Sequence, residues 1–415
     1  MNAQAAVRGA ELAAGGQAIA AGPSWLARLW TGGIHRFLDA VDRGVARGSI
    51  EVTLPNGAVR ELGGRAPGFA AQVQIREIAA LLRLATGGSV GCYQAWEAGQ
   101  WDSPDPVQLF ALIMDNGPTL GEIGRARGPW RWLTRLAHRR HRNTRAGALR
   151  NIHAHYDLGN DFYAAWLDPT MSYSSARFAR ADEPLEQAQQ RKYASIAERI
   201  AGARTVLEIG CGWGSLAAHL ATEGAQVTAL SLSEEQLAHA RRAYGGSTIE
   251  FRKQDYRDVT GQFDAVASVE MVEAVGAEYW PAFFDCLQRC LKPGGRAAIQ
   301  YIAMRDELFD GYARNADFIQ TYVFPGGLLV RESEFRRLAA ERGLRWSDDA
   351  YFAADYSETL RRWRARFDLV VEEGRLPPGF DARFVRLWQF YLMYCEGGFA
   401  GGAIYVAQAT LTKPG

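Results

Sequence analysis

Apolar residues in the second half of the chain fall into two alternating patterns. Short apolar runs that predict strands occupy residues 205–209, 226–230, 263–269 and 296–302. Amphipathic stretches that predict helices lie between them, at residues 216–222, 234–244 and 280–291. Strands that alternate with helices are typical of a mainly parallel sheet covered by helices on both faces. We therefore expect a doubly wound α/β domain from residue 151 to 415, with its ligand at the carboxyl ends of the strands.

The first part of the chain has a different pattern, which predicts a small α+β domain at residues 23–124. Residues 1–22 are rich in Ala, Gly and Gln and predict a mobile tail without the apolar run of a secretory signal. The expected elements are a helix near Trp25–Trp30, a strand at 49–54 followed by a turn at 55–57, a helix at 74–84, and loops at Gly87–Gly88 and 96–101.

Composition excludes several classes of protein. The hydrophobic fraction of 48% and charged fraction of 22% exclude a largely disordered chain. No run of 18 apolar residues predicts a transmembrane helix. Five scattered cysteines favour a reducing cytoplasm over a disulfide framework. Cys286 and Cys290 lie four residues apart without a second Cys/His pair, so we expect helix packing and no metal site.

One segment of the chain carries positive charge without any compensating acid. The net charge is +1, yet residues 125–150 contain nine arginines and no acid. A basic block attracts phosphate groups, and Trp130 and Trp132 beside it suit the headgroup level of a membrane. The alternative is a solvated linker.

A glycine-rich turn carries the first chemical signal. Residues 206–214 read VLEIGCGWG, so a predicted strand runs into three glycines and then a helix. Glycines let the backbone approach a ligand, and Glu208 favours a cationic ligand over a pyrophosphate. The pattern resembles the first motif of methyltransferases that use S-adenosylmethionine (SAM). The predicted SAM contacts in this run are Glu208, Gly210, Gly212, Trp213 and Gly214.

The ends of the next two strands extend the predicted nucleoside site. Ser231 and Gln236 can hydrogen-bond the ribose or the methionine portion, while Ser233 suits the N-cap of the following helix. Asp255 can accept from the adenine amino group, and Tyr256 can lie against the ring. The alternative for Asp255 is a residue that forms a turn.

A longer series of motifs resembles the cyclopropane-fatty-acyl-phospholipid synthase family, which includes the mycolic acid cyclopropane synthases. The matching runs are HYDLGNDFY at 155–163, LDPTMSYS at 167–174, DYRD at 255–258, EMVEAVG at 270–276, LKPGG at 291–295, YVFPGG at 322–327 and DYSETL at 355–360. They span residues 150–412 in order. Residues 91–96 and 99–102 also resemble the small N-terminal domain of longer bacterial members.

The resemblance implies a fold, an activity and a place in the cell. It implies the seven-stranded fold of class I SAM methyltransferases, with Tyr173 and Ser174 at the methionine carboxylate. Family members alkylate the cis double bond of an acyl chain on a phospholipid, and loss of a proton closes a cyclopropane ring. The implied partner is an unsaturated phospholipid in an anionic membrane, reached from the cytoplasmic face. Related enzymes are often dimers, which makes a homodimer an expected state.

In the family a bicarbonate ion is thought to take the proton. The matching ligand positions are Ser175, Glu273, Gln300, Ile302 and Tyr356, and Cys395 matches a further cysteine near the pocket, with packing as its alternative. Ser175 and Gln300 stand where many members have Cys and His, and Ala274 replaces a His. Ser and Gln can hydrogen-bond an oxyanion, but neither offers a cationic charge. Aromatic faces stabilise cations, and the candidates for the acyl tunnel are Tyr322, Phe324, Tyr356 and Phe399.

Other functions remain open on the sequence alone. Methyl transfer without ring closure would give a methyl-branched or furan-type precursor. A lipid-binding protein with an inactive methyltransferase fold is a further alternative. A nucleic-acid-binding protein would use the basic segment, but the chain lacks ordered basic and aromatic readout motifs, so we expect no nucleic-acid partner.

Overall fold

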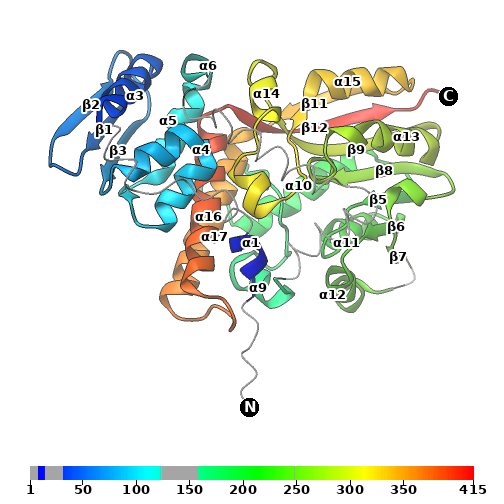
Figure 1. Ribbon diagram of the computed structural model, residues 1–415. Coiled ribbons are helices and arrows are strands. Elements are labelled where there is room, and N and C mark those ends of the chain that lie inside the picture. The colour runs from blue at the N-terminus through cyan, green and yellow to red at the C-terminus, as the bar shows by residue number, and fades with distance from the viewer. Residues whose placement is uncertain (1–7, 15–30, 122, 124–157, 247) are drawn as a thin grey trace. The chain divides into compact units, whose positions relative to one another are not determined.

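The computed structural model describes residues 8–14, 31–121, 123, 158–246 and 248–415 (Figure 1). The chain forms two compact units. The first contains residues 1–141, 305–325 and 378–404, and the second contains residues 142–304, 326–377 and 405–415. We expected a small domain at 23–124, an arginine-rich linker at 125–150 and a second domain at 151–415, whereas residues 305–325 and 378–404 group here with the N-terminal residues. The segment Trp25–Trp30 and the arginine-rich residues 125–150 lie outside the described residues.

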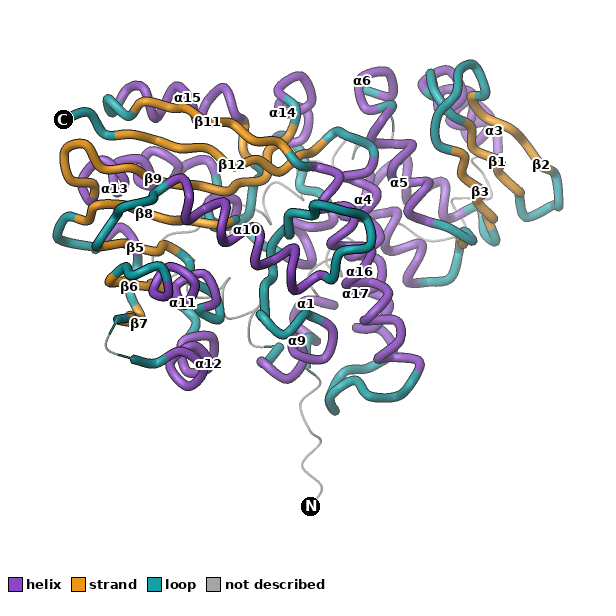
Figure 2. The backbone as a smooth tube through the Cα atoms, turned by 180° about the vertical axis from the view of Figure 1, so that it is seen from behind, coloured by secondary structure: helices purple, strands orange, loops and turns teal. Residues whose placement is uncertain are grey.

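The second unit is built on one sheet with the order β11-β12-β9-β8-β5-β6-β7, to which β10 adds a short pairing with β9. Figures 1 and 2 show this sheet flanked by helices. The strands are β5 Thr205–Ile209, β6 Gln226–Ser231, β7 Ile249–Lys253, β8 Phe263–Val269, β9 Leu291–Met304, β10 Val330–Arg331, β11 Arg345–Tyr351 and β12 Ile404–Thr412. β7-β6-β5-β8-β9 pair in parallel, and β11 pairs antiparallel with β12. The expected mainly parallel, doubly wound α/β sheet is confirmed.

The helices of this unit follow the expected alternation. They are α9 Asn160–Trp166, α10 Leu185–Arg199, α11 Ser215–Thr222, α12 Glu234–Tyr244, α13 Trp280–Cys290, α15 Glu332–Glu341 and α16 Ala353–Glu372, with short turns η2 Tyr256–Asp258, η3 Val272–Ala274 and η4 Ala277–Tyr279. Ile196 of α10, Leu216 of α11 and Leu237 of α12 share one buried cluster with β5, β6 and β8. Burial of these apolar faces holds the carboxyl ends of the strands, where the site lies, in a fixed register.

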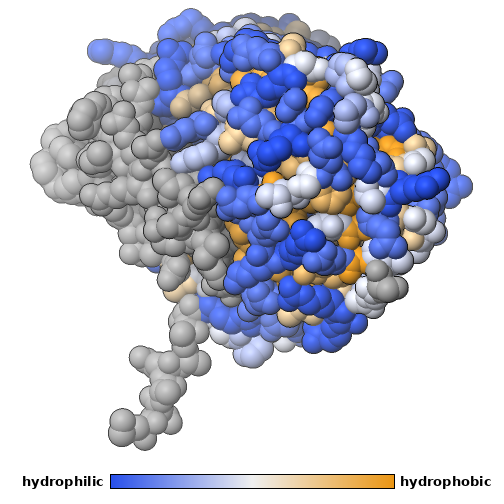
Figure 3. All heavy atoms as spheres, turned by 90° about the vertical axis from the view of Figure 1, so that its right-hand side faces the viewer, coloured by the Kyte–Doolittle hydropathy of each residue, from blue (hydrophilic) through white to orange (hydrophobic). Residues whose placement is uncertain are grey.

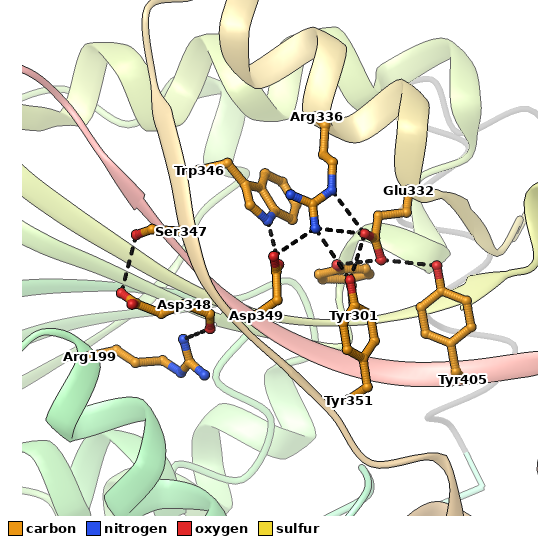
Figure 4. Close-up of polar contacts among 10 residues, drawn as sticks. All are labelled: Arg199, Tyr301, Glu332, Arg336, Trp346, Ser347, Asp348, Asp349, Tyr351 and Tyr405. Carbon is orange, nitrogen blue, oxygen red and sulfur yellow. Dashed lines mark hydrogen bonds and ion pairs between the residues drawn. The ribbon is translucent and has the colours of Figure 1, made fainter.

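A polar cluster around Glu332 fastens α15 to the sheet (Figure 4). The carboxylate of Glu332 accepts hydrogen bonds from the hydroxyls of Tyr301 on β9, Tyr351 on β11 and Tyr405 on β12, at 3.0, 2.8 and 2.9 Å. Arg336, one turn later on α15, donates to the same carboxylate at 2.9 Å. Three strands and one helix therefore meet at a single charged group.

The first unit contains a four-stranded sheet with the order β2-β1-β3-β4. Its strands are β1 Ser49–Thr53, β2 Val59–Gly63, β3 Ala70–Ile75 and β4 Trp101–Asp102. Its helices are α1 Ala10–Ala14, α3 Thr31–Gly44, α4 Ala79–Glu97, α5 Pro106–Asp115, α6 Gly117–Leu120, α14 Asp306–Ala313, the π-helical turn η5 Ile319–Val323 and α17 Ala382–Ala400. α17 approaches α5 closely, because a Cβ at Gly397 would lie 2.5 Å from Cβ of Phe110. The predicted strand at 49–54 and its turn are confirmed.

Two predicted elements of this unit are wrong. Gln74 and Ile75 end β3, and the helix expected at 74–84 begins only at Ala79. The loop expected at Gly87–Gly88 lies inside α4, which kinks at Gly88 with φ +58°. A Cβ at Gly91 would lie 2.0 Å from the carbonyl oxygen of Arg83, so these glycines allow the two halves of α4 to pack closely rather than end the helix.

None of the described helices combines the length and the apolar character that crossing a bilayer requires. Figure 3 shows a face of the second unit covered mostly by hydrophilic side chains, with apolar ones scattered between them. Within the described residues, no group of three or more His, Cys, Asp or Glu side chains is placed to hold a metal ion. Cys286 and Cys290 are buried on α13, where they pack as expected.

Candidate active site

The glycine turn joins β5 to α11 and leaves open space at its centre. Gly210, Gly212 and Gly214 have φ angles of +84°, +53° and +94°, which L side chains rarely adopt. A Cβ at Gly210 would lie 2.8 Å from Cγ of Met271, and one at Gly214 would lie 2.9 Å from Cβ of Ala240. A Cβ at Gly212 would meet nothing within 4 Å. The outer glycines are required by packing, and the central one borders a space that a ligand can enter.

Glu208 supplies a buried acid beside this turn. Its side chain is 3% exposed on β5, and Oε2 has no hydrogen-bond partner. Burial raises the pKa of Glu208 to about 8, although the ammonium of Lys192 opposes this rise. A buried carboxyl with one unpartnered oxygen suits a ligand that brings positive charge or hydrogen-bond donors. The open turn and this acid together fit SAM, which carries both.

Lys192 is a site residue that sequence analysis missed. It lies on α10, is 1% exposed, and donates through Nζ to Oγ of Ser174 at 2.7 Å. Burial lowers its pKa to about 8, while Glu270, Asp168 and Glu208 favour the charged form. The available signal was a lysine on the buried stripe of an amphipathic helix, four residues from both Ala188 and Ile196. The hydroxyl of Ser174, which is predicted to contact the methionine carboxylate, therefore lies next to the ammonium of Lys192.

Aromatic side chains surround the entrance to the turn. The ring of Tyr173 packs against Tyr163, Trp166 and Trp363, with centroids 5.4 to 5.7 Å apart. Trp213 packs against Tyr163 and donates through Nε1 to Oδ1 of Asn160 on α9, at 2.7 Å. Tyr173 and Trp213, both predicted SAM contacts, belong to one aromatic wall.

The residues at the ends of β6 and β7 form local hydrogen bonds. Oγ of Ser231 donates to Oε1 of Gln236 at 3.0 Å, and Ser233 caps α12 by accepting from the Gln236 N–H. Both carboxylate oxygens of Asp255 accept from Arg257, and its Oδ1 also accepts the Arg257 N–H. The structural role weighed for Asp255 is therefore present, and its contact with adenine stays a prediction. Tyr256 is buried beside it.

A second cluster lies where β8 and β9 end, and Glu270 is its centre. Oε1 of Glu270 accepts from the Ser175 N–H at 2.9 Å and from Nε2 of Gln300 at 2.7 Å. Oε2 accepts from the hydroxyl of Tyr356 at 2.8 Å. Sequence analysis quoted Glu270 only as part of a motif and did not assign it to the site. Its importance depends on three partners that are distant in the sequence.

A hydrogen bond from Gln408 fixes the orientation of the Gln300 side chain. Its Oε1 accepts from Nε2 of Gln408 on β12 at 3.0 Å, which turns Nε2 of Gln300 toward Glu270. The hydroxyl of Ser175 donates instead to the carbonyl of Ala176. Ser175 therefore donates to the Glu270 carboxylate through its backbone N–H and not through its hydroxyl.

Glu273 lies on η3 and holds a second carboxyl in the same cluster. Its Oε1 accepts from the Ile302 N–H on β9, and its Oε2 has no hydrogen-bond partner. Burial, and then the neighbouring Glu270, raise the pKa of Glu273 to about 8. Two nearby carboxylates cannot both ionise easily, so Glu273 keeps its proton at neutral pH.

These contacts do not fit a bicarbonate ion. The predicted ligands Ser175, Gln300 and Tyr356 give their donors to Glu270, and the Ile302 N–H donates to Glu273. An added anion would have to displace a carboxylate from each of these donors and would be repelled by Glu270. The structure brings the five predicted residues together, but around the chain's own carboxyl groups.

The remaining predicted residues belong to the first compact unit. Cys395 lies on α17, where burial raises its pKa above the usual thiol range and keeps the thiol protonated. Tyr322 accepts a hydrogen bond from Gln94 at 3.4 Å, Phe324 packs against Tyr391, and Phe399 is buried on α17. Their roles around an acyl chain stay predictions.

Comparison with known proteins connects this geometry to lipid enzymes. Residues 143–409 match the family of mycolic acid cyclopropane synthetases. The chain is 38% identical over 351 residues to a tuberculostearic acid methyltransferase of Mycobacterium tuberculosis, covering 80% of this chain and 81% of that protein. It is 31% identical over 359 residues to the cyclopropane-fatty-acyl-phospholipid synthase of Escherichia coli, covering 85% and 90%.

Solved structures show the same relationship. A mycolic acid cyclopropane synthase crystallised with SAH and CTAB has a TM-score of 0.59 and 26% identity, and the match covers 64% of this chain and 98% of that one. A coclaurine N-methyltransferase bound to SAH has a TM-score of 0.59 at 16% identity, over 78% and 99% of the two chains, which shows the shared fold.

Proposed function

Because the chain belongs to the mycolic acid cyclopropane synthetase family of SAM-dependent methyltransferases, we propose that it methylates the cis double bond of an unsaturated acyl chain on a phospholipid. The observation that carries this proposal is the pairing of the open glycine turn and Glu208 with a second set of carboxyl groups at the ends of β8 and β9. The first set suits a cationic methyl donor, and the second suits a cationic reaction intermediate.

One set of residues in this chain binds SAM, and a second set stabilises the carbocation that forms on the acyl chain. When bound, SAM supplies an electrophilic methyl group. Glu208 and the glycine turn hold it, while Ser174, backed by Lys192, faces its methionine carboxylate. An alkene is a weak nucleophile, and its methylation leaves a carbocation. The carboxylate of Glu270 lies in a cluster that is suited to stabilise this charge.

We propose ring closure to a cyclopropane as the product of this reaction. A methyl-branched product without a ring is the second candidate, and two observations favour it. The relative with 38% identity is named a methyltransferase rather than a cyclopropane synthase. Ser175, Gln300 and Ala274 also depart from the family pattern around the site.

We propose that the enzyme works as a peripheral protein on the cytoplasmic face of an anionic membrane, as a homodimer. The arginines of residues 125–150 support the membrane part of this proposal through their attraction to lipid phosphate.

Incubation with methyl-labelled SAM and unsaturated phosphatidylglycerol vesicles tests the activity. We expect label in the acyl chain, and NMR of the released fatty acid distinguishes high-field ring protons from vinyl or branched methyl signals. Label confined to the headgroup, or no label on any unsaturated lipid, would contradict the proposal.

A further inference from the structure

We propose that Glu270 is the proton acceptor of the reaction, so that this enzyme carries its own base and works without bicarbonate. The inference deepens the proposed function and rests on it. The family resemblance implied that a bicarbonate ion takes the proton, but the residues present do not fit that ion. The inference assigns the proton transfer to Glu270 instead.

The first argument is geometric. Glu270 receives three hydrogen bonds from three separate segments: the Ser175 N–H, the side-chain amide of Gln300 on β9 and the hydroxyl of Tyr356 on α16. These donors fix the position of both oxygens. Oε1 accepts two bonds and Oε2 accepts one, so Oε2 retains a lone pair for a proton. The donors that would orient a free oxyanion instead orient a carboxylate that is covalently attached to the chain.

The backbone of Glu270 gives an independent indication. Its φ is +48°, in the left-handed region that a non-glycine residue seldom adopts. A non-glycine residue there is strained relative to relaxed backbone, and such positions cluster at functional sites. The backbone N–H of Glu270 donates to the Gln300 carbonyl at 2.8 Å, which holds this conformation against β9. The chain thus keeps an acidic side chain at a position where glycine would be unstrained.

The surroundings also favour Glu270 over Glu273 as the charged group. Burial raises the pKa of both acids, but at Glu270 three donors and the ammonium of Lys192 oppose the rise, whereas the carboxyl of Glu273 accepts a backbone N–H from Ile302. Negative charge on Glu270 is among the causes that raise the pKa of Glu273 to about 8. Of the two acids, Glu270 is therefore the one whose contacts favour the negative charge, and Glu273 is the protonated neighbour.

The step balances without any further reactant. In methyl transfer the alkene π pair forms one C–C bond to the methyl group of SAM, and the methyl–sulfur bond breaks with its electron pair staying on sulfur. S-adenosylhomocysteine is the leaving group, and a cation remains on the neighbouring carbon. Breaking a C–H bond of the added methyl group releases an electron pair that closes the third ring bond. Oε2 of Glu270 takes the proton and later releases it to water. If a different C–H bond breaks, the same acceptor yields an unsaturated methyl-branched chain.

Three variants of the full-length enzyme test the assignment. Glu270→Gln keeps the shape and removes the proton acceptor, so we expect turnover to fall about 100-fold or more, while SAM affinity by calorimetry stays within about threefold. Glu270→Gly relaxes the backbone and leaves three donors around an anion-sized space. This variant should bind ¹³C-bicarbonate in NMR titrations and recover turnover when bicarbonate is added. Glu186→Gln, which removes an exposed acid from α10, is the matched control.

The parent enzyme should neither bind ¹³C-bicarbonate nor slow in buffer freed of carbon dioxide. Dependence of the parent on bicarbonate, or near-parental turnover of Glu270→Gln, would overturn the inference. Failure of Glu270→Gly to bind bicarbonate, with its fold intact by circular dichroism, would also overturn the assigned geometry. Absence of any methylated lipid with the parent would instead contradict the proposed function, and the bicarbonate titration would still test the site.

Discussion

At the scale of single residues, hydrogen-bond donors distinguish the buried acids of the site. Burial raises the pKa of all three, to about 8 for Glu208 and Glu273, but at Glu270 three donors and a nearby lysine oppose the rise. Acids of identical chemistry thereby acquire different roles. The sequence identified Glu208 and Glu273, because each follows a recognisable motif. Glu270 lies in the same motif as Glu273, but its role could not be inferred from the sequence, because its partners come from residues 175, 300 and 356.

The raised pKa of Glu208 predicts pH-dependent SAM binding. Below pH 8 the free enzyme holds Glu208 protonated, and a cationic ligand favours the ionised form, so binding releases a proton. We expect SAM affinity to rise up to about tenfold per pH unit as the pH increases from 6 toward 8. Calorimetry in buffers of different ionisation enthalpy measures the released proton. Glu208→Gln should bind more weakly at pH 8 and lose most of this slope; an unchanged slope would contradict the assignment.

Lys192 should shift this pH profile. Its ammonium favours the ionised form of Glu208 and donates to Ser174. We expect Lys192→Met to move the binding curve to higher pH and to weaken SAM affinity at pH 7 about tenfold, as expected for a shift of one pKa unit. Calorimetric titrations from pH 6 to 9 test this. Lys253→Met, at an exposed lysine of β7, provides the control, and identical curves for the two variants would show that Lys192 only packs.

At the scale of secondary structure elements, the sequence predicted best where periodicity was clear. The helix expected at 234–244 and the strand at 263–269 coincide with α12 and β8. The prediction failed at α4, where Gly87 and Gly88 have the composition of a loop but occupy a kinked helix. Local composition could not reveal this, because a close contact between Gly91 and the Arg83 carbonyl, formed only on folding, explains the glycines.

Alanine substitutions at two glycines of the same turn should affect different properties, folding stability at Gly214 and SAM affinity at Gly212. Gly214→Ala would place Cβ 2.9 Å from Ala240 and 3.1 Å from the Phe251 ring, so we expect a loss of roughly 1–3 kcal/mol of stability, visible as a lower Tm. Gly212→Ala meets open space and should cost only about 1 kcal/mol of backbone strain. Its new methyl group should nevertheless weaken SAM binding at least tenfold. Parental SAM affinity in Gly212→Ala would remove the turn from the binding site.

At the scale of the whole molecule, a block of positive charge and the candidate catalytic acids lie apart in the sequence. The acids of the site are residues 208, 270 and 273, whereas nine arginines without a single acid occupy residues 125–150. A nearly neutral protein with such a segment can approach an anionic surface through that segment without an overall positive charge. The sequence alone predicts this property, since composition is sufficient to establish it.

Membrane attraction should therefore depend on three arginines of this segment. Each Arg near an anionic surface contributes about 1 kcal/mol at low ionic strength, so replacing Arg139, Arg140 and Arg142 by Gln should weaken binding to phosphatidylglycerol vesicles by about 100-fold. The difference should shrink as salt shortens the Debye length to about 8 Å at 0.15 M. Vesicle co-sedimentation at 20 and 150 mM salt measures both effects.

A second triple variant separates local from total charge. Arg36, Arg204 and Arg345 are exposed in the described part of the chain, and their replacement by Gln removes the same charge from other surfaces. If the segment 125–150 contacts lipid, this control should bind vesicles within about threefold of the parent. Equal weakening in both triple variants would mean that net charge alone drives binding. Unchanged binding after loss of Arg139, Arg140 and Arg142 would exclude these arginines from the contact with the membrane, whatever lipid the enzyme methylates.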